Sequence, residues 1–283
     1  MNRYMLLIFS CLVLCSQQYV EADFFNNHDE LCSSTDSYKV IKKLGRGLYG
    51  EVYAVENSQG QIFALKSYKN QGPQTIFQPL YAHAEREYLR GQAFDNRRII
   101  KSIDFFIDHT HSDSSLNIVI LELVEGILLS KIEKEVLSRE KATTIAVNLC
   151  HLLKYALSQG FVYADLHLGN VMLTVDDDIR IIDLASFLNL EEYDEVCKPF
   201  KYFLPNCTDE FSLQNVNHPL VIYFDTIAEF SFKIIAKSKI SREEKMNLHI
   251  EIKKLAWNYA EDLEEGKEVF ITEYLNKLIE TLS

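Results

Sequence analysis

The sequence has no excess of basic residues. It contains 29 lysine and arginine residues against 41 aspartate and glutamate residues, which gives a formal net charge of −12. A chain with this balance is repelled by phosphate backbones and by anionic lipid surfaces. The composition therefore argues against nucleic acid or an anionic membrane as the main partner.

The sequence also shows no internal repeat, no low-complexity tract and no cysteine pair at zinc-finger spacing. A hydrophobic fraction of 47% and a charged fraction of 25% are those of an ordinary globular protein, not of a disordered or fibrous one. A chain of 283 residues is long enough for one two-lobed domain or for two small domains.

Residues 1–22 have the pattern of a secretory signal peptide. Arg3 supplies a positive charge, Met5–Leu14 form a short apolar run, and Val20 and Ala22 are small residues before a cleavage point. The apolar run is too short to span a bilayer comfortably, so no stable membrane span is expected after cleavage. An uncleaved anchor or a buried strand is the alternative. We expect a secreted protein, or one of a secretory-pathway lumen or periplasm.

Cleavage would leave four cysteines in an oxidising environment, namely Cys32, Cys150, Cys197 and Cys207. Cys197 and Cys207 are close enough in sequence to form a disulfide bond that closes one loop. Cys150 lies in a helical pattern and is also consistent with a free buried thiol. Asn206 begins an Asn-x-Thr glycosylation tripeptide, a pattern that is common by chance.

A glycine-rich segment follows the first clear strand pattern. Tyr38–Leu44 alternates and leads into Gly45, Gly47 and Gly50. The residues that follow, from Val52 onward, favour β-structure. The loop is therefore expected to join two strands, whereas a dinucleotide-binding glycine motif opens a helix. Glycines in such a loop let backbone amides approach phosphates.

The segment Phe161–Asp183 carries a second group of polar residues. Its apolar stretches and the acidic turn at residues 176–178 predict a hairpin that brings Asp165, Asn170 and Asp183 to one end. Carboxylate and amide oxygens are ligands that suit Mg²⁺. An ordinary hairpin with an acidic turn is the alternative for this stretch alone.

Taken in order, these segments resemble the protein kinase superfamily. Asp165 and Asn170 have the spacing of the kinase catalytic loop, and Asp183 stands where the metal-binding Asp-Phe-Gly motif begins. Gln61–Lys66 is similar to the kinase strand that ends in a lysine. The resemblance covers roughly residues 38–283.

The resemblance implies an α+β fold: a two-lobed protein kinase-like domain with a five-stranded N-lobe and a mainly helical C-lobe. We expect the N-lobe at about residues 38–123 and the C-lobe at about 124–283, after an exposed leader at 23–37. A long helix from Ser138 is expected to deliver the catalytic loop. Asp225 matches the aspartate that anchors that loop from below.

The resemblance also implies the catalytic roles. Asp165 would act as the catalytic base, and Lys66 would contact the α- and β-phosphates of ATP. A helix at residues 81–92 would supply the glutamate that pairs with Lys66. We assign this role to Glu85 rather than to Glu87, because the apolar pair Tyr88-Leu89 then occupies the positions at which the family has an apolar pair.

The cofactors implied are ATP and Mg²⁺ or Mn²⁺. The metal would be held by Asn170 and Asp183. Leu121 would stand beside the adenine as the gatekeeper. The residues expected to bind the nucleotide are Gly45, Gly47, Gly50, Val52, Ala64, Lys66, Glu122 and Leu123.

Several positions depart from the family pattern. Ala164 replaces the arginine that pairs with a phosphate on the activation loop, so we expect activity that is independent of loop phosphorylation. The acidic residues at 191–195 are expected to have no local cation. His167 and Gly169 are more similar to small-molecule kinases, and Ala185 replaces the glycine of Asp-Phe-Gly.

The interpretation we favour is an ATP-dependent phosphotransferase, namely a protein kinase acting on hydroxyl groups. The alternatives are a small-molecule or sugar kinase of the same fold and a nucleotide-binding pseudokinase. The partners expected are thus ATP and a protein or small-molecule hydroxyl acceptor. The joint presence of five phosphoryl-transfer groups argues against the pseudokinase.

Overall fold

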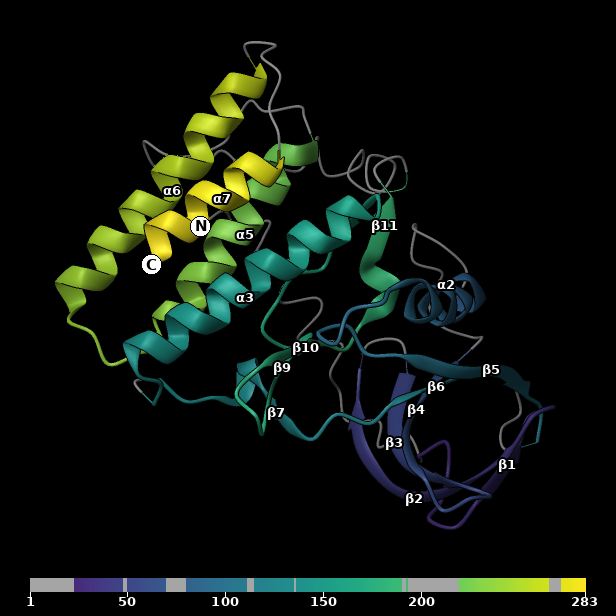
Figure 1. Ribbon diagram of the computed structural model, residues 1–283. Coiled ribbons are helices and arrows are strands. Elements are labelled where there is room, and N and C mark those ends of the chain that lie inside the picture. Colours follow the sequence, from purple (N-terminus) through teal and green to yellow (C-terminus); the bar gives the residue numbers. More distant parts are fainter. Residues whose placement is uncertain are drawn as a thin grey trace, which may run out of the picture.

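The computed structural model describes residues 23–47, 50–69, 80–110, 115–134, 136–189, 192, 219–264 and 271–283. It shows two lobes: a small lobe built on a curled antiparallel sheet and a large lobe made mainly of helices (Figure 1). The predicted two-lobed α+β architecture is confirmed.

The small lobe contains a six-stranded sheet in the order β1-β2-β3-β4-β6-β5. Its strands are β1 (Glu30–Cys32), β2 (Ser37–Arg46), β3 (Gly50–Asn57), β4 (Ile62–Lys69), β5 (Ser102–Asp108) and β6 (Leu116–Glu122). The helix α2 (Leu80–Ala93) lies against this sheet (Figure 1). The prediction of five strands is one strand short, because β1 belongs to the segment that was expected to be a leader.

Residues 23–37 are part of the small lobe, and the prediction of an exposed leader there is wrong. β1 pairs with β2, and the side chains of Phe25 and Leu31 are only 2% and 1% exposed. The backbone N–H of Phe25 donates to the hydroxyl of Tyr53 over 3.3 Å. A three-residue strand with one inward side chain gives too little alternation to be recognised in sequence.

A buried carboxylate also ties this segment to the glycine-rich hairpin. Glu51 is fully buried and directly follows Gly50. Its carboxylate accepts from the backbone N–H of Phe24 at 2.9 Å and from Tyr53, and it pairs with Lys43. A buried charge is tolerated only when it is paired and hydrogen-bonded in this way.

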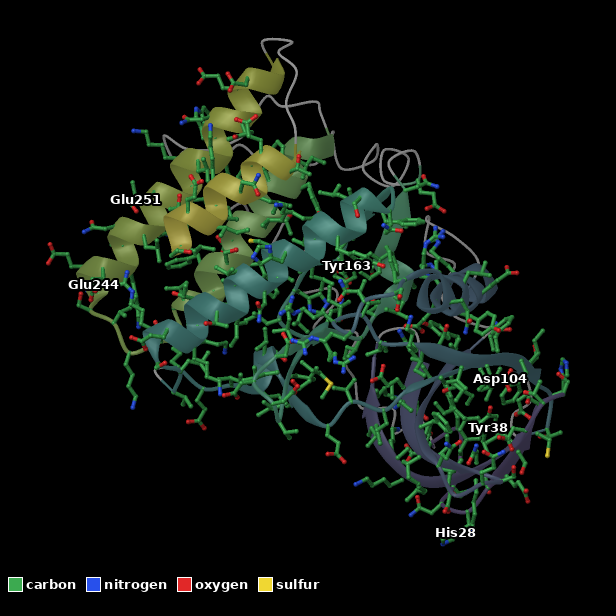
Figure 2. All side chains as sticks on the ribbon, in the orientation of Figure 1. His28, Tyr38, Asp104, Tyr163, Glu244 and Glu251 are labelled. Carbon is green, nitrogen blue, oxygen red and sulfur yellow. The ribbon has the colours of Figure 1, made fainter. Side chains whose placement is uncertain are left out.

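The sheet curls until its last strand, β5, contacts β2 and the residues between β1 and β2. Asp104 of β5 accepts hydrogen bonds from the hydroxyl of Tyr38 at 3.1 Å and from that of Thr35 at 2.8 Å (Figure 2). Tyr38 also stacks on Phe106 of β5, with ring centroids 6.0 Å apart. The inner face of the curled sheet therefore encloses a core of its own.

The helices of the large lobe are α3 (Arg139–Ser158), α5 (Pro219–Ile235), α6 (Arg242–Glu264) and α7 (Ile271–Leu282). α3 begins as predicted, with Ser138 as the N-cap whose side chain accepts from the N–H of Lys141. Gly160, with a φ of 84°, follows its end. Within the described part of the chain, no helix combines the length and the apolar character needed to cross a bilayer.

Short strands connect the helices to the rest of the domain. They are β7 (Gly126–Leu128), β8 (Phe161–Tyr163), β9 (Val171–Thr174), β10 (Ile179–Ile181) and β11 (Phe187–Asn189). β9 and β10 form the predicted hairpin. β8 instead pairs with β11, the strand that follows the 3-10 turn η2 (Leu184–Ser186).

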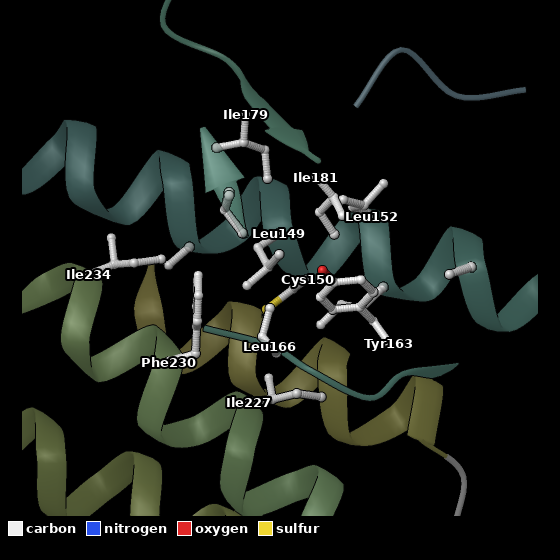
Figure 3. Packing of buried hydrophobic residues seen from close by; sticks show 14 of the residues in the cluster. Leu149, Cys150, Leu152, Tyr163, Leu166, Ile179, Ile181, Ile227, Phe230 and Ile234 are labelled. Carbon is white, nitrogen blue, oxygen red and sulfur yellow. The ribbon is translucent and has the colours of Figure 1, made fainter. Parts of the chain in front are cut away.

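The core of the large lobe holds the segment predicted to be the catalytic loop in place. Side chains of α3 and α5 pack against Tyr163 and Leu166 of the loop and against Ile179 and Ile181 of the hairpin (Figure 3). Each large aliphatic side chain buried in this way contributes about 1.5–3 kcal/mol. The polar residues between these anchors are therefore held in a fixed frame.

The cysteines within the described residues are free. Cys32 is exposed, and Cys150 is buried in α3, where burial raises the pKa of its thiol to about 12. Cys197, Cys207 and Asn206 lie outside the described residues, as does the predicted signal peptide at 1–22.

Candidate active site

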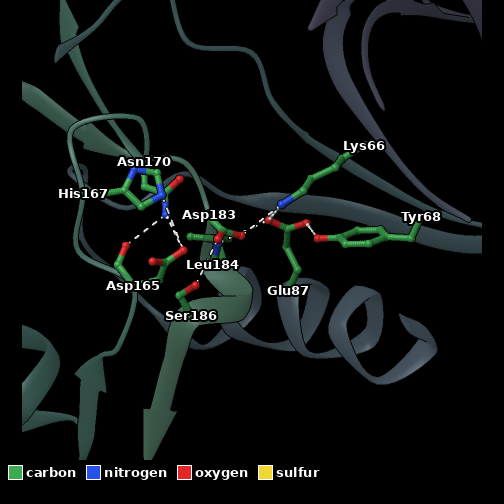
Figure 4. A network of polar contacts seen from close by, with 9 residues as sticks. All are labelled: Lys66, Tyr68, Glu87, Asp165, His167, Asn170, Asp183, Leu184 and Ser186. Atoms are coloured by element: carbon green, nitrogen blue, oxygen red, sulfur yellow. Dashed lines mark hydrogen bonds and ion pairs between the residues drawn. The ribbon is translucent and has the colours of Figure 1, made fainter. Parts of the chain in front are cut away.

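Lys66 lies at the centre of a polar network between the lobes (Figure 4). Its Nζ is 3.0 Å from Oε1 of Glu87 and 3.0 Å from Oδ1 of Asp183. β4 supplies the lysine, α2 the glutamate, and the end of the hairpin the aspartate. Burial alone would lower the pKa of Lys66, but the two carboxylates raise it well above its usual range. The ammonium group is therefore held in its charged form.

The prediction that Glu85 pairs with Lys66 is wrong, because the structure places Glu87 there. Residues two apart on a helix point to nearly opposite sides, so only one of the two glutamates can face the lysine. Glu87 is fully buried and Glu85 is exposed. The spacing of Ala84, Glu87 and Gly91 marks the buried face of α2, and it was the signal available in the sequence.

Tyr68 is a member of the network that the sequence reasoning missed. Its hydroxyl donates to Oε2 of Glu87 over 2.5 Å, and Lys66 Nζ lies 5.1 Å from the centre of its ring. The N–H of Leu184 donates to the other carboxylate oxygen, Oε1, at 3.3 Å. The buried carboxylate of Glu87 is thus bonded on both oxygens. The position of Tyr68, two residues after Lys66 on the same strand, was the only hint in the sequence.

The residues expected to contact the nucleotide base share one face of the sheet. Val52 lies opposite Lys66 on neighbouring strands, and Ala64 lies opposite Leu121. Cross-strand partners project to the same side, and residues two apart on a strand do too. This face is the one that carries Lys66 toward Asp183.

The chain passes between the lobes directly after β6. Glu122 ends that strand, and Leu123 follows it. The N–H of Glu122 donates to the carbonyl of Lys101 at 2.8 Å, and its carboxylate lies 3.4 Å from Arg180. The side chain of Glu122 is therefore engaged by the protein itself, whereas Leu123 lies beyond the sheet.

The glycine-rich segment joins β2 and β3, as predicted. The N–H of Gly47 donates to the carbonyl of Gly50 at 2.8 Å, and residues 48–49 lie outside the described part. The space that a side chain would occupy at Gly45 is open. By contrast, a Cβ at Gly50 would lie 1.6 Å from the carbonyl oxygen of Ser67. Gly50 is therefore required by the close approach of β3 and β4.

The residues of the predicted catalytic loop are arranged around Asp165 (Figure 4). The side-chain amide of Asn170 donates to the carbonyl of Asp165 at 3.0 Å and to its Oδ2 at 3.2 Å. His167 Nε2 lies 3.5 Å from the same carboxylate oxygen, and the hydrogen bond to Asp165 raises the pKa of His167. The N–H of Gly169 donates to Nδ1 of His167, and a Cβ at Gly169 would lie 2.9 Å from the ring.

Asn170 and Asp183 are held beside each other by the backbone. The N–H of Ile182 donates to the carbonyl of Asn170 at 3.1 Å. The second oxygen of Asp183 accepts from the hydroxyl of Ser186 at 3.0 Å. Burial would raise the pKa of Asp183, but Lys66 outweighs that effect and lowers it. The described residues contain no cluster of three or more His, Cys, Asp or Glu side chains suited to a metal.

A further contact lies on the other side of α2. Glu192 pairs with Arg90, with 3.0 Å between Oε2 and Nη2, and its Oε1 lies 4.0 Å from Nε of Arg86. The expectation that the acidic residues at 191–195 have no local cation is therefore wrong for Glu192. The arginines are about one hundred residues away from Glu192 in the sequence, so no local sequence pattern indicated the contact.

Asp225 has a different partner from the one predicted. Its carboxylate accepts from Lys253 of α6 at 2.6 Å, and its side chain is 42% exposed. Among the described residues it thus joins α5 to α6 and does not hold the catalytic loop. That loop is anchored instead by the apolar packing of Tyr163 and Leu166.

A family model described as the protein kinase domain matches residues 38–218. A putative serine/threonine-protein kinase of Acanthamoeba polyphaga mimivirus is 29% identical over 160 residues, which are 55% of this chain and 24% of that protein. The mouse serine/threonine-protein kinase tousled-like 2 is 29% identical over 185 residues, 61% of this chain and 25% of that protein. Zebrafish mitogen-activated protein kinase 12 is 28% identical over 152 residues, 53% of this chain and 41% of that protein.

The chain therefore spans from about a quarter to about two fifths of the length of these relatives. The matched region begins in β2 and includes strands β2 to β6 of the small-lobe sheet, α2, α3 and the segment from Asp165 to Asp183. Together with the two-lobed fold, this match places the chain in the protein kinase family.

Proposed function

We propose that this protein is an ATP-dependent protein kinase that phosphorylates serine and threonine hydroxyl groups. The observation that carries the proposal is the ion pair between Lys66 and Glu87, with Asp183 equally close to the same ammonium group. An inert scaffold would have no use for three buried or half-buried charges held in this geometry at the junction of two lobes. The names of the related kinases support a serine/threonine acceptor.

Lys66 and the glycine-rich hairpin would hold the nucleotide. In this proposal Lys66 binds the α- and β-phosphates, and Glu87 keeps the ammonium group directed toward them. The backbone at Gly45 and Gly47 has room for phosphate oxygens, because nothing lies close to the positions where side chains would be. The adenine would lie against Val52, Ala64 and Leu121.

The residues at the metal position fit Mg²⁺ or Mn²⁺. Asp183 supplies an ionised carboxylate, and Asn170 supplies an amide oxygen that is not used in the hydrogen bonds of its NH₂ group. One carboxylate and one amide suit an ion that takes its other ligands from phosphates and water. When bound, the ion neutralises charge on the phosphates. The protein's own part is to keep Asp183 ionised and beside Asn170.

Asp165 would act on the acceptor. Its carboxylate is exposed, with 61% of the side chain open to solvent, and the amide of Asn170 fixes its orientation. In the proposed step the acceptor oxygen bonds to the γ-phosphorus, the bond from that phosphorus to ADP breaks, and the hydroxyl proton passes to Asp165. Positioning and charge stabilisation supply most of the rate enhancement in such reactions.

The test is phosphate transfer by the purified chain from Asp23 onward. Labelled ATP is supplied with Mg²⁺ or Mn²⁺, a panel of basic and acidic proteins, and a panel of sugars and aminoglycosides. Asp183→Ala is the loss-of-function control, and Glu85→Gln, on the exposed side of α2, is the matched neutral control. Label on serine or threonine that is lost only in Asp183→Ala supports the proposal.

Label on a small molecule would replace the proposal by the second candidate, a small-molecule phosphotransferase. One observation favours that candidate: His167 lies beside Asp165 where protein kinases usually have a lysine, and Gly169 makes room for its ring. Binding of ATP with no transfer to any acceptor would favour a pseudokinase.

We further propose that the chain is secreted or enters a secretory lumen or periplasm. Arg3, the apolar run Met5–Leu14 and the small residues Val20 and Ala22 support this location. N-terminal sequencing of the protein produced in its own cells tests it. A mature chain that begins at Asp23 is the expected result, and an N-terminus at Met1 would contradict it.

A further inference from the structure

The helix α2 is held from two sides. Glu87 faces the small-lobe sheet and binds Lys66, while Arg86 and Arg90 project toward the segment that follows Asp183. Arg86 and Arg90 are four residues apart and therefore lie on one face of the helix. The position of α2 decides whether Glu87 reaches Lys66. Contacts that hold Arg86 and Arg90 therefore also help to keep the ion pair between Glu87 and Lys66.

The arginine face is bound to the segment after Asp183 at successive points. Nε of Arg90 donates to the carbonyl of Phe187 at 3.0 Å, and Nη2 donates to Oε2 of Glu192 at 3.0 Å. The guanidinium group also lies over the ring of Phe161, 4.3 Å from its centre. These contacts fix the plane of the guanidinium group, which favours a directional hydrogen bond to a carboxylate.

Glu192 is also hydrogen-bonded to Asn189, three residues earlier in the chain. Its backbone N–H donates to the side chain of Asn189 at 2.8 Å, and its carboxylate accepts from the N–H of Asn189 at 2.9 Å. The reciprocal pair fixes the carboxylate to its own segment of the chain. Little side-chain entropy is therefore lost when it meets the arginines.

The two arginines of this face carry like charges at positions with little exposure to solvent. The side chains of Arg86 and Arg90 are only 13% and 16% exposed, so their mutual repulsion is weakly screened. Glu192 supplies a negative charge close to both of them. Ala164 provides no cation on the catalytic loop, so the anion of this segment has its cations on α2 instead.

We propose that Glu192 is a positioning residue that permanently anchors α2. Its carboxylate holds the helix through Arg90 so that Glu87 stays on Lys66 without phosphorylation of the segment after Asp183. This inference rests on the proposed kinase function for its kinetic readout. It gives a structural basis for the expectation that activity is independent of phosphorylation in a chain without the usual arginine beside Asp165.

The test compares wild type with Glu192→Gln, Arg90→Met and the double variant, all treated with phosphatase. Glu192→Gln keeps the shape of the side chain and removes its charge. We expect kcat to fall by about tenfold, because a charge-assisted hydrogen bond of this kind shifts an equilibrium by roughly that factor, with the KM of the acceptor unchanged. In the Arg90→Met background the same change should have no further effect on kcat.

The matched control is Glu244→Gln. Glu244 also pairs with an arginine, Arg139, at 3.1 Å, but the pair is exposed at the start of α6. Its loss should leave kcat unchanged. If Glu192 has a purely structural role, Glu192→Gln will lower the thermal stability without reducing kcat per folded molecule. That result would overturn the inference.

A second measurement does not require turnover. Hydrogen exchange at the amides of α2 and of Leu184, which donates to Glu87, should be faster in Glu192→Gln than in wild type or Glu244→Gln. If wild type transfers phosphate to no acceptor, the proposed function fails, while this exchange still decides the inference. Unchanged exchange, or a wild-type kcat that falls on phosphatase treatment, would show that Glu192 does not anchor the helix.

Discussion

The hydroxyl of Tyr68 donates a 2.5 Å hydrogen bond to Glu87, the carboxylate that also binds Lys66. Both residues are almost completely buried. Glu87 thus pairs with Lys66 and accepts a hydrogen bond from Tyr68, and both of these partners lie on β4. A buried carboxylate that loses one donor is penalised by the desolvation of the freed oxygen.

Tyr68→Phe should therefore weaken both the fold and the enzyme. Removal of the hydroxyl is expected to lower the free energy of unfolding by about 1–3 kcal/mol. It should also reduce kcat/KM for ATP, since Glu87 is free to turn away from Lys66. Urea denaturation and steady-state kinetics measure the two effects. Tyr88→Phe, on a half-buried residue of α2, is the control, and equal effects of the two changes would contradict the assigned role of Tyr68.

Glu87→Gln and Glu85→Gln should differ sharply although the residues are neighbours on α2. The first removes the charge that orients Lys66 and is expected to lower kcat by about 10- to 100-fold, because misplacement of a reactive group has costs of this size. The second changes an exposed side chain and should leave kcat near that of wild type. Phosphate transfer under saturating ATP provides the comparison, and a greater loss in Glu85→Gln would reverse the assignment.

Two glycines of the glycine-rich segment should respond differently to alanine. Gly50→Ala places a Cβ against the carbonyl of Ser67 and should destabilise the protein by about 3 kcal/mol, as overpacking between strands does. Gly47→Ala meets nothing nearer than 4.0 Å and should leave the free energy of unfolding almost unchanged. It should instead weaken ATP binding. Urea denaturation measures the change in stability, and calorimetric titration with ATP measures the change in nucleotide binding. Similar unfolding curves for Gly50→Ala and Gly47→Ala would contradict the prediction.

Asp178 should make the stability of the large lobe sensitive to acid. The carboxylate lies 2.7 Å from Arg98 and 2.8 Å from Arg97. Burial would raise the pKa of Asp178, but the hydrogen bond from Arg98 and the nearby charges lower it below the usual 3.8. A lowered pKa in the folded state means that the stabilisation is present above pH 3.8 and is lost as the pH falls through the folded-state pKa.

Asp178→Asn should accordingly lower the free energy of unfolding by about 1–3 kcal/mol at neutral pH. The difference from wild type should shrink as the medium is acidified toward the pKa of Asp178. Urea denaturation at several pH values gives the curve. Asp177→Asn serves as the control, because Asp177 is exposed and its ion pair with Lys141 is screened. A difference that stays constant with pH would show that the charge of Asp178 is not responsible.

Phe25→Ala should destabilise the small lobe although the residue lies near the start of the described chain. Phe25 is 2% exposed and packs edge-to-face on Tyr53 at 5.2 Å. Loss of such a ring is expected to reduce the free energy of unfolding by about 3 kcal/mol. Asn27→Ala, at an exposed position, is the control. If both variants unfold like wild type, the N-terminal segment does not belong to the lobe.

Strong local signals explain what the sequence revealed of the fold. The N-cap at Ser138 and the apolar spacing after it predicted α3, and the acidic turn at 176–178 predicted the hairpin of β9 and β10. These elements depend on neighbours in sequence, so a single chain contains the information. The position of Lys66 directly after a run of mostly apolar residues in β4 is likewise a local property.

The features that were missed depend on residues far apart in sequence. Whether Glu85 or Glu87 faces Lys66 is set by how α2 packs on the sheet, and both residues suit a helix equally well. Tyr68 gains its role only because Glu87 is brought to it. The contact of Glu192 with Arg90 joins positions 102 residues apart. Such contacts follow from tertiary packing and leave no periodic trace.

The small-lobe sheet is drawn from one uninterrupted part of the chain. Its six strands lie between Glu30 and Glu122, and the core inside the curl runs from Phe25 to Ile120. During synthesis this unit can close before the helices of the large lobe have left the ribosome. Asp165, Asn170 and Asp183 come later. The lobe that carries Lys66 can therefore form first, and the residues of the candidate active site are all present only when the second half of the chain has been made.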